Sequence, residues 1–259
     1  MQRDLAANFR DMRMIDQYRT ISTQYSAARK DDHTNFLETP TVQSVLGDLS
    51  GASAIDYACG TGHYSRLLKR LGAKNVLGVD LSPAMIEAAR HEESQNALGI
   101  VYEVGDAATM AVFGSFDVAT AAFLFNYAED EQTLAQMFRS VAANVIPDGR
   151  LVAVVPNPDF VNGREDTLPY GFFLEEIGEG PMRLRVRMTF VGEEKFWIEF
   201  TQWSRRAYED ALAQAGFVDA EWTRFAVSKE GIERYGQKFW DAILANPKSV
   251  VLSARKKPA

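Results

Sequence analysis

The chain has 259 residues, and its 35 acidic and 28 basic side chains give a formal net charge of −7. Hydrophobic residues make up 46% and charged residues 24%, as in an ordinary globular protein that can bury a full core. The acidic balance disfavours nucleic acid as a partner, because contacts to phosphates need an excess of Lys and Arg. The single cysteine, Cys59, excludes an internal disulfide and a multi-cysteine metal site, so we expect no metal.

The N-terminal residues interleave charged and apolar side chains and lack the continuous apolar segment of a secretory signal. The longest uncharged apolar stretch, residues 118–127, is about half the ~20 residues that a membrane-spanning helix requires. We therefore expect a cytoplasmic protein without a membrane partner, acting as a monomer or homodimer.

Between Ala54 and Val155, short apolar runs alternate with amphipathic segments, which is typical of βαβ units and a mostly parallel sheet. Ser82 and Pro83 have the residue types of an N-cap and a first helical position. Five strands are expected, at 54–57, 75–80, 100–104, 116–122 and 150–155, the last after a Pro147-Asp148-Gly149 turn. Helices are expected at 63–71, from Pro83 onward with Met85, Ile86 and Ala89 buried, and at 134–145.

The pattern changes after Pro156. Residues 183–188 and 197–200 alternate charged and apolar side chains, which predicts antiparallel strands with one solvent-exposed face. We interpret this part as a β-hairpin inserted on one edge of the sheet. A helix at 205–215 ended by Gly216, and strands at 217–227 and 249–254, would then complete the sheet.

The segment Asp56-Tyr57-Ala58-Cys59-Gly60-Thr61-Gly62 lies between the first predicted strand and the first helix. Glycines there let a ligand approach the backbone, and the following helix N-terminus suits an anionic group. Asp80 ends the second strand 20 residues after Gly60, a spacing at which its carboxylate reaches both hydroxyls of a bound ribose. The plainer alternative is a turn beside a helix-capping aspartate. The loop and the aspartate together favour a nucleoside-containing ligand.

A dinucleotide site would need a third glycine at position 65, where the chain has Ser65. The chain also lacks the Tyr-x-x-x-Lys pair of short-chain dehydrogenases and the Gly-Lys pair of a P-loop. An NAD(P)-dependent reductase is therefore the weaker alternative.

Three motifs together resemble the successive motifs of class I S-adenosylmethionine-dependent methyltransferases. They are Asp-x-x-Cys-Gly-Thr-Gly at 56–62, Gly-Val-Asp-Leu-Ser at 78–82 and Gly-Asp-Ala at 105–107. The resemblance covers about Ala54 to Pro156, and the combination is specific although each motif alone is common. It implies S-adenosylmethionine as cofactor and S-adenosylhomocysteine as product.

The resemblance also implies roles for single residues around the first loop. Gly60 and Gly62 would pass beneath the methionine part of the cofactor. Asp56 and the backbone near Ala58 would engage its ammonium group, with Cys59 beside them in the loop.

The second and third motifs would hold the nucleoside. By the same resemblance, Asp80 would bind the ribose and Leu81 would pack on adenine. Asp106 would accept from the exocyclic amine and the Ala107 N–H would face a ring nitrogen, although Asp106 has the alternative of capping the next helix. Phe123 would lie where the family contacts the aminoacyl group.

Four further segments look like toxoflavin-pathway N-methyltransferases and similar natural-product enzymes, which act on flat, electron-poor nitrogen heterocycles. These segments are residues 121–128, Asn157-Pro158, Tyr170-Gly171-Phe172 and 239–247. The likeness implies N-methylation of a small aromatic or heterocyclic acceptor. The residues themselves leave open O- or C-methylation of another metabolite and a non-catalytic cofactor-binding protein.

The candidate acceptor residues are mostly aromatic. Tyr18 and Tyr25 lie seven apart on one face of the N-terminal segment, where the alternative is the packed stripe of a lid helix. Asn126 and Tyr127 follow the fourth strand, where open α/β sheets bind ligands. We take these four as the catalytic candidates. The substrate-binding candidates of the insertion are Tyr170, Phe172 and Trp197.

The predicted fold is therefore α/β, a Rossmann-like seven-stranded, mostly parallel sheet with helices on both faces. Its parts are an N-terminal helical lid (1–40), the cofactor-binding core (41–156), the inserted substrate-side hairpin (157–204) and the C-terminal part of the core sheet (205–259). The expected reaction is an in-line methyl transfer in which proximity and desolvation lower the barrier, with positioning worth about 7–11 kcal/mol at best.

Overall fold

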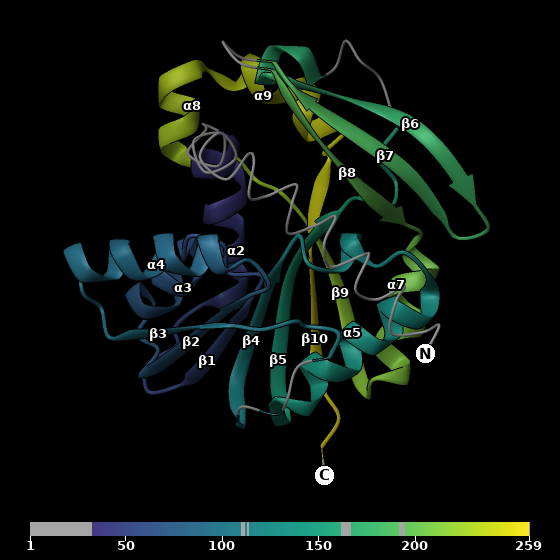
Figure 1. Cartoon of the computed structure of the whole chain (residues 1–259). Helices are drawn as coiled ribbons and strands as arrows, with labels where there is room; N and C mark the ends of the chain where they lie inside the picture. The colour runs from purple at the N-terminus through teal and green to yellow at the C-terminus, as the bar shows by residue number, and fades with distance from the viewer. Residues whose placement is uncertain (1–32, 110–111, 113, 162–166, 192–194, 259) are drawn as a thin grey trace.

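The computed structural model describes residues 33–109, 112, 114–161, 167–191 and 195–258. A seven-stranded sheet runs through the middle of the molecule, with helices packed on both of its faces (Figure 1). Its strands are β1 (Ser53–Tyr57), β2 (Asn75–Asp80), β3 (Ile100–Val104), β4 (Phe116–Ala122), β5 (Val145–Pro156), β9 (Phe217–Arg224) and β10 (Ser249–Lys256). The strand order is β3-β2-β1-β4-β5-β10-β9.

Strands β3, β2, β1, β4 and β5 are parallel, and β10 is antiparallel to both β5 and β9. The chain runs outward from β1 through β2 to β3 and then returns to the other side of β1 as β4. Such a reversal of strand order opens a crevice at the carboxyl ends of the strands, which is where open α/β sheets bind ligands. The predicted Rossmann-like sheet is confirmed.

Two hydrophobic clusters fill the spaces on either side of the sheet. On one face, side chains such as Val76 and Val152 pack against helices α2 (Thr39–Leu46), α3 (His63–Arg70) and α4 (Pro83–Gln95). On the other face, side chains such as Ile55 and Ala153 pack against α5 (Glu131–Ala143) and α7 (Arg205–Gln214). The inner strands, such as β4 and the second half of β5, are largely buried because helices cover both of their faces.

The predicted helix from Pro83 is confirmed in detail. Ser82 Oγ accepts from the Met85 N–H, and Met85, Ile86 and Ala89 are its buried residues. The helix predicted from residue 134 begins three residues earlier, because Asp130 caps it by accepting from the Thr133 N–H.

The Pro147-Asp148-Gly149 segment was predicted as a turn before the fifth strand, but it lies inside β5. Between the pairs Phe116–Val145 and Val118–Arg150, β5 advances by more residues than β4 does, which marks a bulge. Asp148 has a φ of +63° in this bulge. Strand β5 therefore begins before this segment, at Val145, and pairs with β4 again from Arg150.

The insertion after β5 is a separate three-stranded antiparallel sheet, sheet B, made of β6 (Phe172–Gly180), β7 (Arg183–Phe190) and β8 (Phe196–Trp203). The predicted antiparallel insertion after the fifth strand is confirmed, but its predicted place on one edge of the main sheet was wrong, and β6 was not predicted. Strand β5 already pairs with β4 and β10, so no free edge remains beside it. Sheet B instead stands above the main sheet (Figure 1). The predicted wet face is confirmed, since Arg185 and Arg187 ion-pair with Glu199 while Val186 and Met188 are buried.

Hydrogen bonds from β8 fix sheet B over the carboxyl ends of the main sheet. Thr201 Oγ1 donates to the Ala128 carbonyl at 3.0 Å, and Trp203 Nε1 donates to the Phe125 carbonyl at 3.2 Å. Gln202 Nε2 donates to the carbonyl of Asn157, directly after β5. Sheet B is thus held at the end of the sheet where ligands bind.

Two short helices, α8 (Lys229–Tyr235) and α9 (Gln237–Ala245), were not predicted and lie between β9 and β10. They surround Trp240, which is fully buried and donates from Nε1 to the Gly231 carbonyl. Of the predicted lid, residues 33–40 are described. They form a π-helical turn, Thr34–Glu38, that continues into α2 across the proposed boundary at residue 40, and Phe36 and Leu37 are buried in the core.

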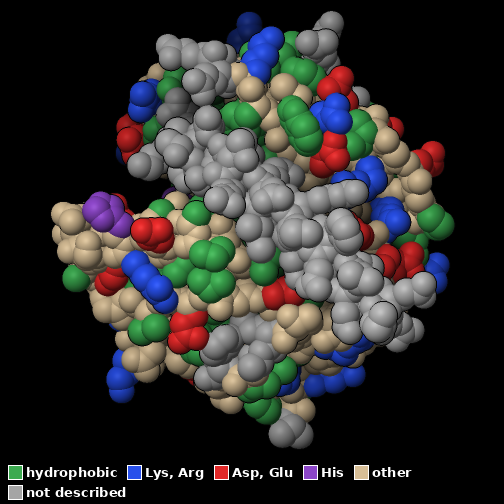
Figure 2. Space-filling view, viewed as in Figure 1, with side chains coloured by type: hydrophobic (Ala, Val, Ile, Leu, Met, Phe, Trp, Pro, Cys, Tyr) green, Lys and Arg blue, Asp and Glu red, His purple; other side chains and the backbone are tan. Residues whose placement is uncertain are grey.

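No helix in the described ranges is long and apolar enough to cross a membrane. Among the same residues, no group of three or more His, Cys, Asp or Glu side chains is placed to hold a metal ion. On the face shown in Figure 2, the described acidic and basic side chains are interspersed, without a wide patch of one sign.

Candidate functional site

The loop from β1 to α3 carries the first motif and is shaped by two positive φ angles at glycine. Gly60 has a φ of +55° and Gly62 one of +91°, and Gly62 N–H donates to the Cys59 carbonyl to close the turn. A Cβ on Gly60 would meet nothing within 4 Å, so this glycine faces open space. A Cβ on Gly62 would overlap the Tyr102 ring. One glycine therefore leaves room for a ligand and the other allows close packing.

Asp80 joins the loop after β1 to the loop after β2. Its Oδ2 accepts from the Gly60 N–H at 2.8 Å, and its Oδ1 accepts from the Ser82 N–H at 2.9 Å. Burial raises the pKa of this carboxyl, and the two backbone bonds act in the opposite direction. A carboxylate has about four acceptor positions, so two remain for a ligand in the pocket.

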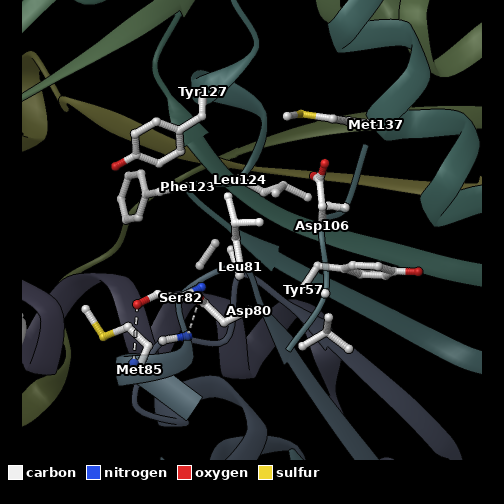
Figure 3. A pocket seen from close by; sticks show the side chains of 16 residues that line it. Tyr57, Asp80, Leu81, Ser82, Met85, Asp106, Phe123, Leu124, Tyr127 and Met137 are labelled. Atoms are coloured by element: carbon white, nitrogen blue, oxygen red, sulfur yellow. Dashed lines mark hydrogen bonds between the residues drawn. The ribbon is translucent and has the colours of Figure 1, made fainter. Parts of the chain in front are cut away.

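A pocket of about 800 Å³, its open mouth included, lies beside Asp80 at the carboxyl ends of β1, β2 and β4. Figure 3 shows Asp80 and Ser82 at one side of the pocket, and Phe123 and Tyr127 at another. The predicted site residues that line it are Ala58, Gly60, Asp80, Leu81, Asp106, Ala107, Phe123 and Tyr127.

Four other predicted residues are near the pocket without lining it: Asp56, Cys59, Gly62 and Asn126. Cys59 is buried, and burial, together with Asp56 and Asp80, raises the pKa of its thiol, so the thiol stays protonated at neutral pH. Its neighbours give it a packing role in the loop.

Asp56 is 1% exposed, and its carboxylate is engaged on both oxygens. Oδ2 accepts from Ser65 Oγ at 2.6 Å and Oδ1 accepts from Thr120 Oγ1 at 2.7 Å. These bonds join α3 and β4 to β1. Burial raises the pKa of Asp56 to about 6 against the lowering effect of the two hydroxyls. An ammonium contact to this carboxylate would have to use its remaining lone pairs.

Replacing Asp56 with asparagine tests whether burial raises the pKa of Asp56. Because the native pKa of Asp56 is raised from 3.8 to about 6, the folded state binds the proton more tightly than the unfolded state, and this group destabilises the fold as pH rises from about 4 to 6. We expect the free energy of unfolding of Asp56→Asn, relative to wild type, to increase over that window by up to about 3 kcal/mol. Urea unfolding at several pH values measures the difference.

Asp117→Asn is the control for that experiment. Hydrogen bonds from Ser53 lower the pKa of Asp117, so its contribution is lost only below the ordinary aspartate range. The difference in free energy of unfolding between Asp117→Asn and wild type should therefore stay constant between pH 4 and 6. A flat difference for Asp56→Asn as well would contradict the raised pKa.

Asp106 follows β3 and organises the turn that bears it. Oδ1 accepts from the Ala108 N–H at 2.8 Å, and Oδ2 accepts from Thr109 Oγ1 at 3.0 Å. Asp106 therefore makes the capping hydrogen bonds that were the alternative to adenine binding, but it caps a turn and not a helix. The residue also lines the pocket, so its capping bonds hold the carboxylate at the cavity wall.

Phe123, Asn126 and Tyr127 come from the segment after β4. Phe123 has a φ of +55°, which is unusual for a residue with a side chain, and its N–H donates to the Val154 carbonyl. This backbone turns the ring toward the pocket beside Tyr127 (Figure 3). Asn126 is 2% exposed, and its Oδ1 has no hydrogen-bond partner among the residues that the structure describes. Buried orphan acceptors cost about 1–3 kcal/mol, so this amide is a candidate for a ligand contact.

The three substrate candidates of the insertion lie in different surroundings. Tyr170 Oη donates to the Phe239 carbonyl at 2.7 Å and accepts from the Ile243 N–H, which fixes it to α9. Phe172 is 1% exposed, at the start of β6. Trp197 is 49% exposed and stacks under Arg187 at 4.7 Å, away from the pocket. The two remaining catalytic candidates, Tyr18 and Tyr25, lie outside the described residues.

Several lining residues were not predicted. They are Tyr57, Val79, Ser82, Met85, Gly105, Ala122, Leu124 and Met137. Most flank a predicted motif residue, so proximity in sequence was an available signal. Met137 is different. Its spacing within α5 predicts that its side chain is buried, but not that it lies beside a cavity.

Residues 54–149 match the model of the methyltransferase domain family. A stretch of 101 residues, 39% of the chain, is 35% identical to the ribosomal protein L11 methyltransferase of Paraburkholderia xenovorans (strain LB400). That match covers 31% of the relative, so the chain spans about a third of the length of the curated relatives it matches.

Solved structures resemble the chain over most of its length. An S-adenosylmethionine-dependent methyltransferase from Mesorhizobium loti has a TM-score of 0.62 at 20% identity, over 88% of this chain and all of that one. CalS10 from Micromonospora echinaspora, an amino pentose methyltransferase involved in calicheamicin biosynthesis and solved with S-adenosylmethionine bound, has a TM-score of 0.54 at 19% identity, over 85% and 89% of the two chains.

The comparisons agree on the fold and on the family that the core resembles. The chain has the fold of the solved S-adenosylmethionine-dependent methyltransferases, and residues 54–149 match the methyltransferase domain model. The pocket described above lies largely within the matched residues.

Proposed function

We propose that this chain transfers the methyl group of S-adenosylmethionine to a small aromatic or heterocyclic acceptor, with N-methylation favoured. The observation that carries the proposal is the pocket in which Gly60, Asp80 and Asp106 meet at the carboxyl ends of β1, β2 and β3. A glycine facing open space, a buried carboxylate and an aromatic mouth fit the aminoacyl, ribose and reacting ends of that cofactor.

The residues fit this cofactor better than a dinucleotide. The position that would need a third glycine holds Ser65, which is fully buried and donates to Asp56. In the dinucleotide fingerprint this third glycine allows close packing of the helix on the strand, and here a buried serine side chain fills that space. This contact weighs against the reductase alternative.

When bound, the cofactor supplies an electrophilic methyl group on a sulfonium. The chain's part is to hold the acceptor in line with that methyl group and to exclude water. Phe123 and Tyr127 are at the pocket wall where an acceptor would lie, and sheet B stands over the carboxyl ends of the strands. The described residues near Phe123 and Tyr127 are mainly apolar, which supports orientation and desolvation as the main contributions.

Two observations support a small acceptor. The match to the L11 methyltransferase covers only 39% of this chain and carries nothing about the acceptor side. CalS10 has the same fold over most of its length, and its named substrate is an amino pentose, a small molecule. Sheet B lies outside the residues that match the family model, and one of the toxoflavin-type segments reaches Phe172, the first residue of β6. Both points support a small acceptor of natural-product type.

Methyl transfer by wild type and Tyr127→Ala tests the proposal. With purified protein, S-adenosylmethionine and a panel of nitrogen heterocycles, phenols and amines, we expect a methylated product by mass spectrometry. Removing the Tyr127 ring should lower kcat/KM about tenfold, because a lost aromatic contact is worth about 1–1.5 kcal/mol. The Kd for S-adenosylhomocysteine should change less than the acceptor KM.

Trp197→Ala is the matched comparison, since it removes an aromatic side chain from sheet B that is half exposed to solvent. We expect its kcat/KM to equal that of wild type. A larger loss in Trp197→Ala than in Tyr127→Ala would restore the assignment of Trp197 to the acceptor. Tight cofactor binding without transfer to any panel member would instead indicate the non-catalytic binding protein.

A further inference from the structure

The π-helical turn that ends at Glu38 lies against the first turn of α3. Glu38 and Thr39, at the junction of this turn with α2, contact the first two residues of α3. Tyr64 Oη donates to Glu38 Oε1 at 2.6 Å, and Thr39 Oγ1 is hydrogen-bonded to His63 Nε2 at 2.9 Å. Because α3 directly follows Gly62, these contacts hold the chain where the loop after β1 becomes a helix.

The bond between Tyr64 and Glu38 is shielded from water. Glu38 is 0% exposed and Tyr64 is 5% exposed. The separation of 2.6 Å is typical of a hydroxyl group bound to a carboxylate, a kind of hydrogen bond that is stronger than one between neutral groups. The bond therefore fixes the Tyr64 side chain relative to the turn that carries Glu38.

The turn that carries Glu38 is itself anchored on another side. The Phe36 carbonyl accepts from the N–H of Ser228, the N-cap of α8, at 2.7 Å. The Phe36 ring packs edge-on against the buried Trp240, with the ring centroids 6.3 Å apart. Glu38 is therefore presented to Tyr64 from a packed base.

The first turn of α3 needs a restraint because its N-cap is a glycine. Gly62 has no side chain that could accept from the first turn. Helices α4, α5, α7 and α8 begin with a Ser or Asp whose side chain does so. The Gly62 N–H also closes the loop onto the Cys59 carbonyl, and Gly60, two residues earlier, lines the pocket. The Tyr64–Glu38 bond thus restrains from the side a helix start that bears directly on the pocket.

We propose that Glu38 is a positioning residue for the cofactor: by accepting from Tyr64 it fixes the first turn of α3, and with it the loop at residues 60–62 that receives the aminoacyl end of S-adenosylmethionine. This inference rests on the proposed function and adds to it a residue outside the three motifs. Glu38 acts through Tyr64 and has no contact of its own with the cofactor. A loop that is already ordered spares the binding energy that ordering it would cost.

Two substitutions remove the bond from opposite ends. Tyr64→Phe removes the donor and Glu38→Met removes the acceptor. We expect each variant to bind S-adenosylhomocysteine about tenfold more weakly than wild type by titration calorimetry, because the loop must then be ordered on binding. The double variant should lose no more than either single variant, since both substitutions remove the same bond. Glu38→Gln keeps an oxygen that can accept from Tyr64 and should stay within about threefold of wild type.

Hydrogen–deuterium exchange gives a second readout that needs no cofactor. Without cofactor, we expect residues 60–65 to exchange faster in Tyr64→Phe and Glu38→Met than in wild type, and S-adenosylhomocysteine should restore most of the protection. A role of Glu38 that is confined to packing its own turn would instead raise exchange in residues 34–38 and leave residues 60–65 unchanged.

Arg66→Met is the matched control, because Arg66 also links α3 to a neighbouring element through its side chain. Arg66 Nη1 lies 2.8 Å from Glu93 Oε2 of α4. This link is not made by the first two residues of the helix. The variant should therefore keep the wild-type Kd and the wild-type exchange over residues 60–65.

Three results would overturn the inference. They are wild-type affinity in Tyr64→Phe and Glu38→Met, unchanged exchange over residues 60–65 in both, or equal losses in Arg66→Met, which would indicate a general loosening of α3. Absence of S-adenosylhomocysteine binding by wild type would instead refute the proposed function. The exchange comparison without cofactor would still decide whether the Tyr64–Glu38 bond orders the loop.

Discussion

Asp80→Ala is expected to weaken binding of S-adenosylhomocysteine at least about 100-fold. Under the proposed function, the substitution removes the acceptor for two ribose hydroxyls, and hydrogen bonds to a charged group contribute about 1.5–3 kcal/mol each, or about 3–6 kcal/mol together. It also releases the Gly60 and Ser82 N–H groups that the carboxylate now orders. Because burial raises the pKa of Asp80, the wild-type affinity should fall as the carboxylate protonates at low pH. Titration calorimetry measures both effects.

Asp117→Asn is a matched control for this result. Asp117 Oδ2 also accepts from a backbone N–H, that of Ser53, at 2.8 Å, but Ser53 begins β1 and is remote from the pocket. Its loss should lower stability without changing the Kd. Equal affinities of Asp80→Ala and wild type would remove Asp80 from the cofactor site, whereas equal losses in both variants would indicate a general effect on folding.

Gly62→Ala is expected to lower the free energy of unfolding by about 2–5 kcal/mol. An alanine at the φ of +91° found here adopts an unfavourable backbone conformation, at a cost of about 1–2 kcal/mol. Its Cβ would also overlap Tyr102 Oη and lie 2.9 Å from Tyr102 Cζ, and overpacking adds about 1–3 kcal/mol. Tyr102 is 3% exposed, so its ring has little room to move. Urea unfolding measures the loss.

Two further variants separate the causes of this loss. Adding Tyr102→Phe to Gly62→Ala should recover part of the stability, because it removes the overlapping hydroxyl and leaves the backbone strain. Gly60→Ala should cost only about 1 kcal/mol, since its Cβ meets nothing. The same variant should weaken S-adenosylhomocysteine binding about tenfold, because the added methyl group enters the pocket. If Gly60→Ala proved the less stable of the two, the packing at Gly62 would be refuted.

The parallel part of the sheet was predictable because its strands are short apolar runs between amphipathic segments, and its turns carry clear signals. Residues 75–80, 100–104 and 116–122 were predicted with the bounds that the structure has. Strand β6 was missed because its alternation is interrupted between Glu176 and Gly178, where its register with β7 shifts. Helices α8 and α9 are short, and tertiary contacts around Trp240 stabilise them more than a long amphipathic pattern does.

For the candidate site, motif spacing predicted which loops meet but not where each side chain points. Asp80 and Asp106 line the pocket as expected of residues at strand ends. Asp56 lies one residue before the end of β1, and its carboxylate instead turns toward Ser65 and Thr120. Neither of these residues is in one of the three motifs.

The position of β10 also bears on how the chain reaches its native state. This strand lies between β5 and β9 and pairs with both, although it is the last strand in the sequence. Until residues 249–256 are in place, β9 has no partner in the sheet, and β5 presents an open edge of the kind that favours aggregation. Closing the sheet requires contacts over about 100 residues of chain, which slows folding. A chaperone that shields the β5 edge during synthesis would therefore raise the yield of folded protein more than one that acts on the finished chain.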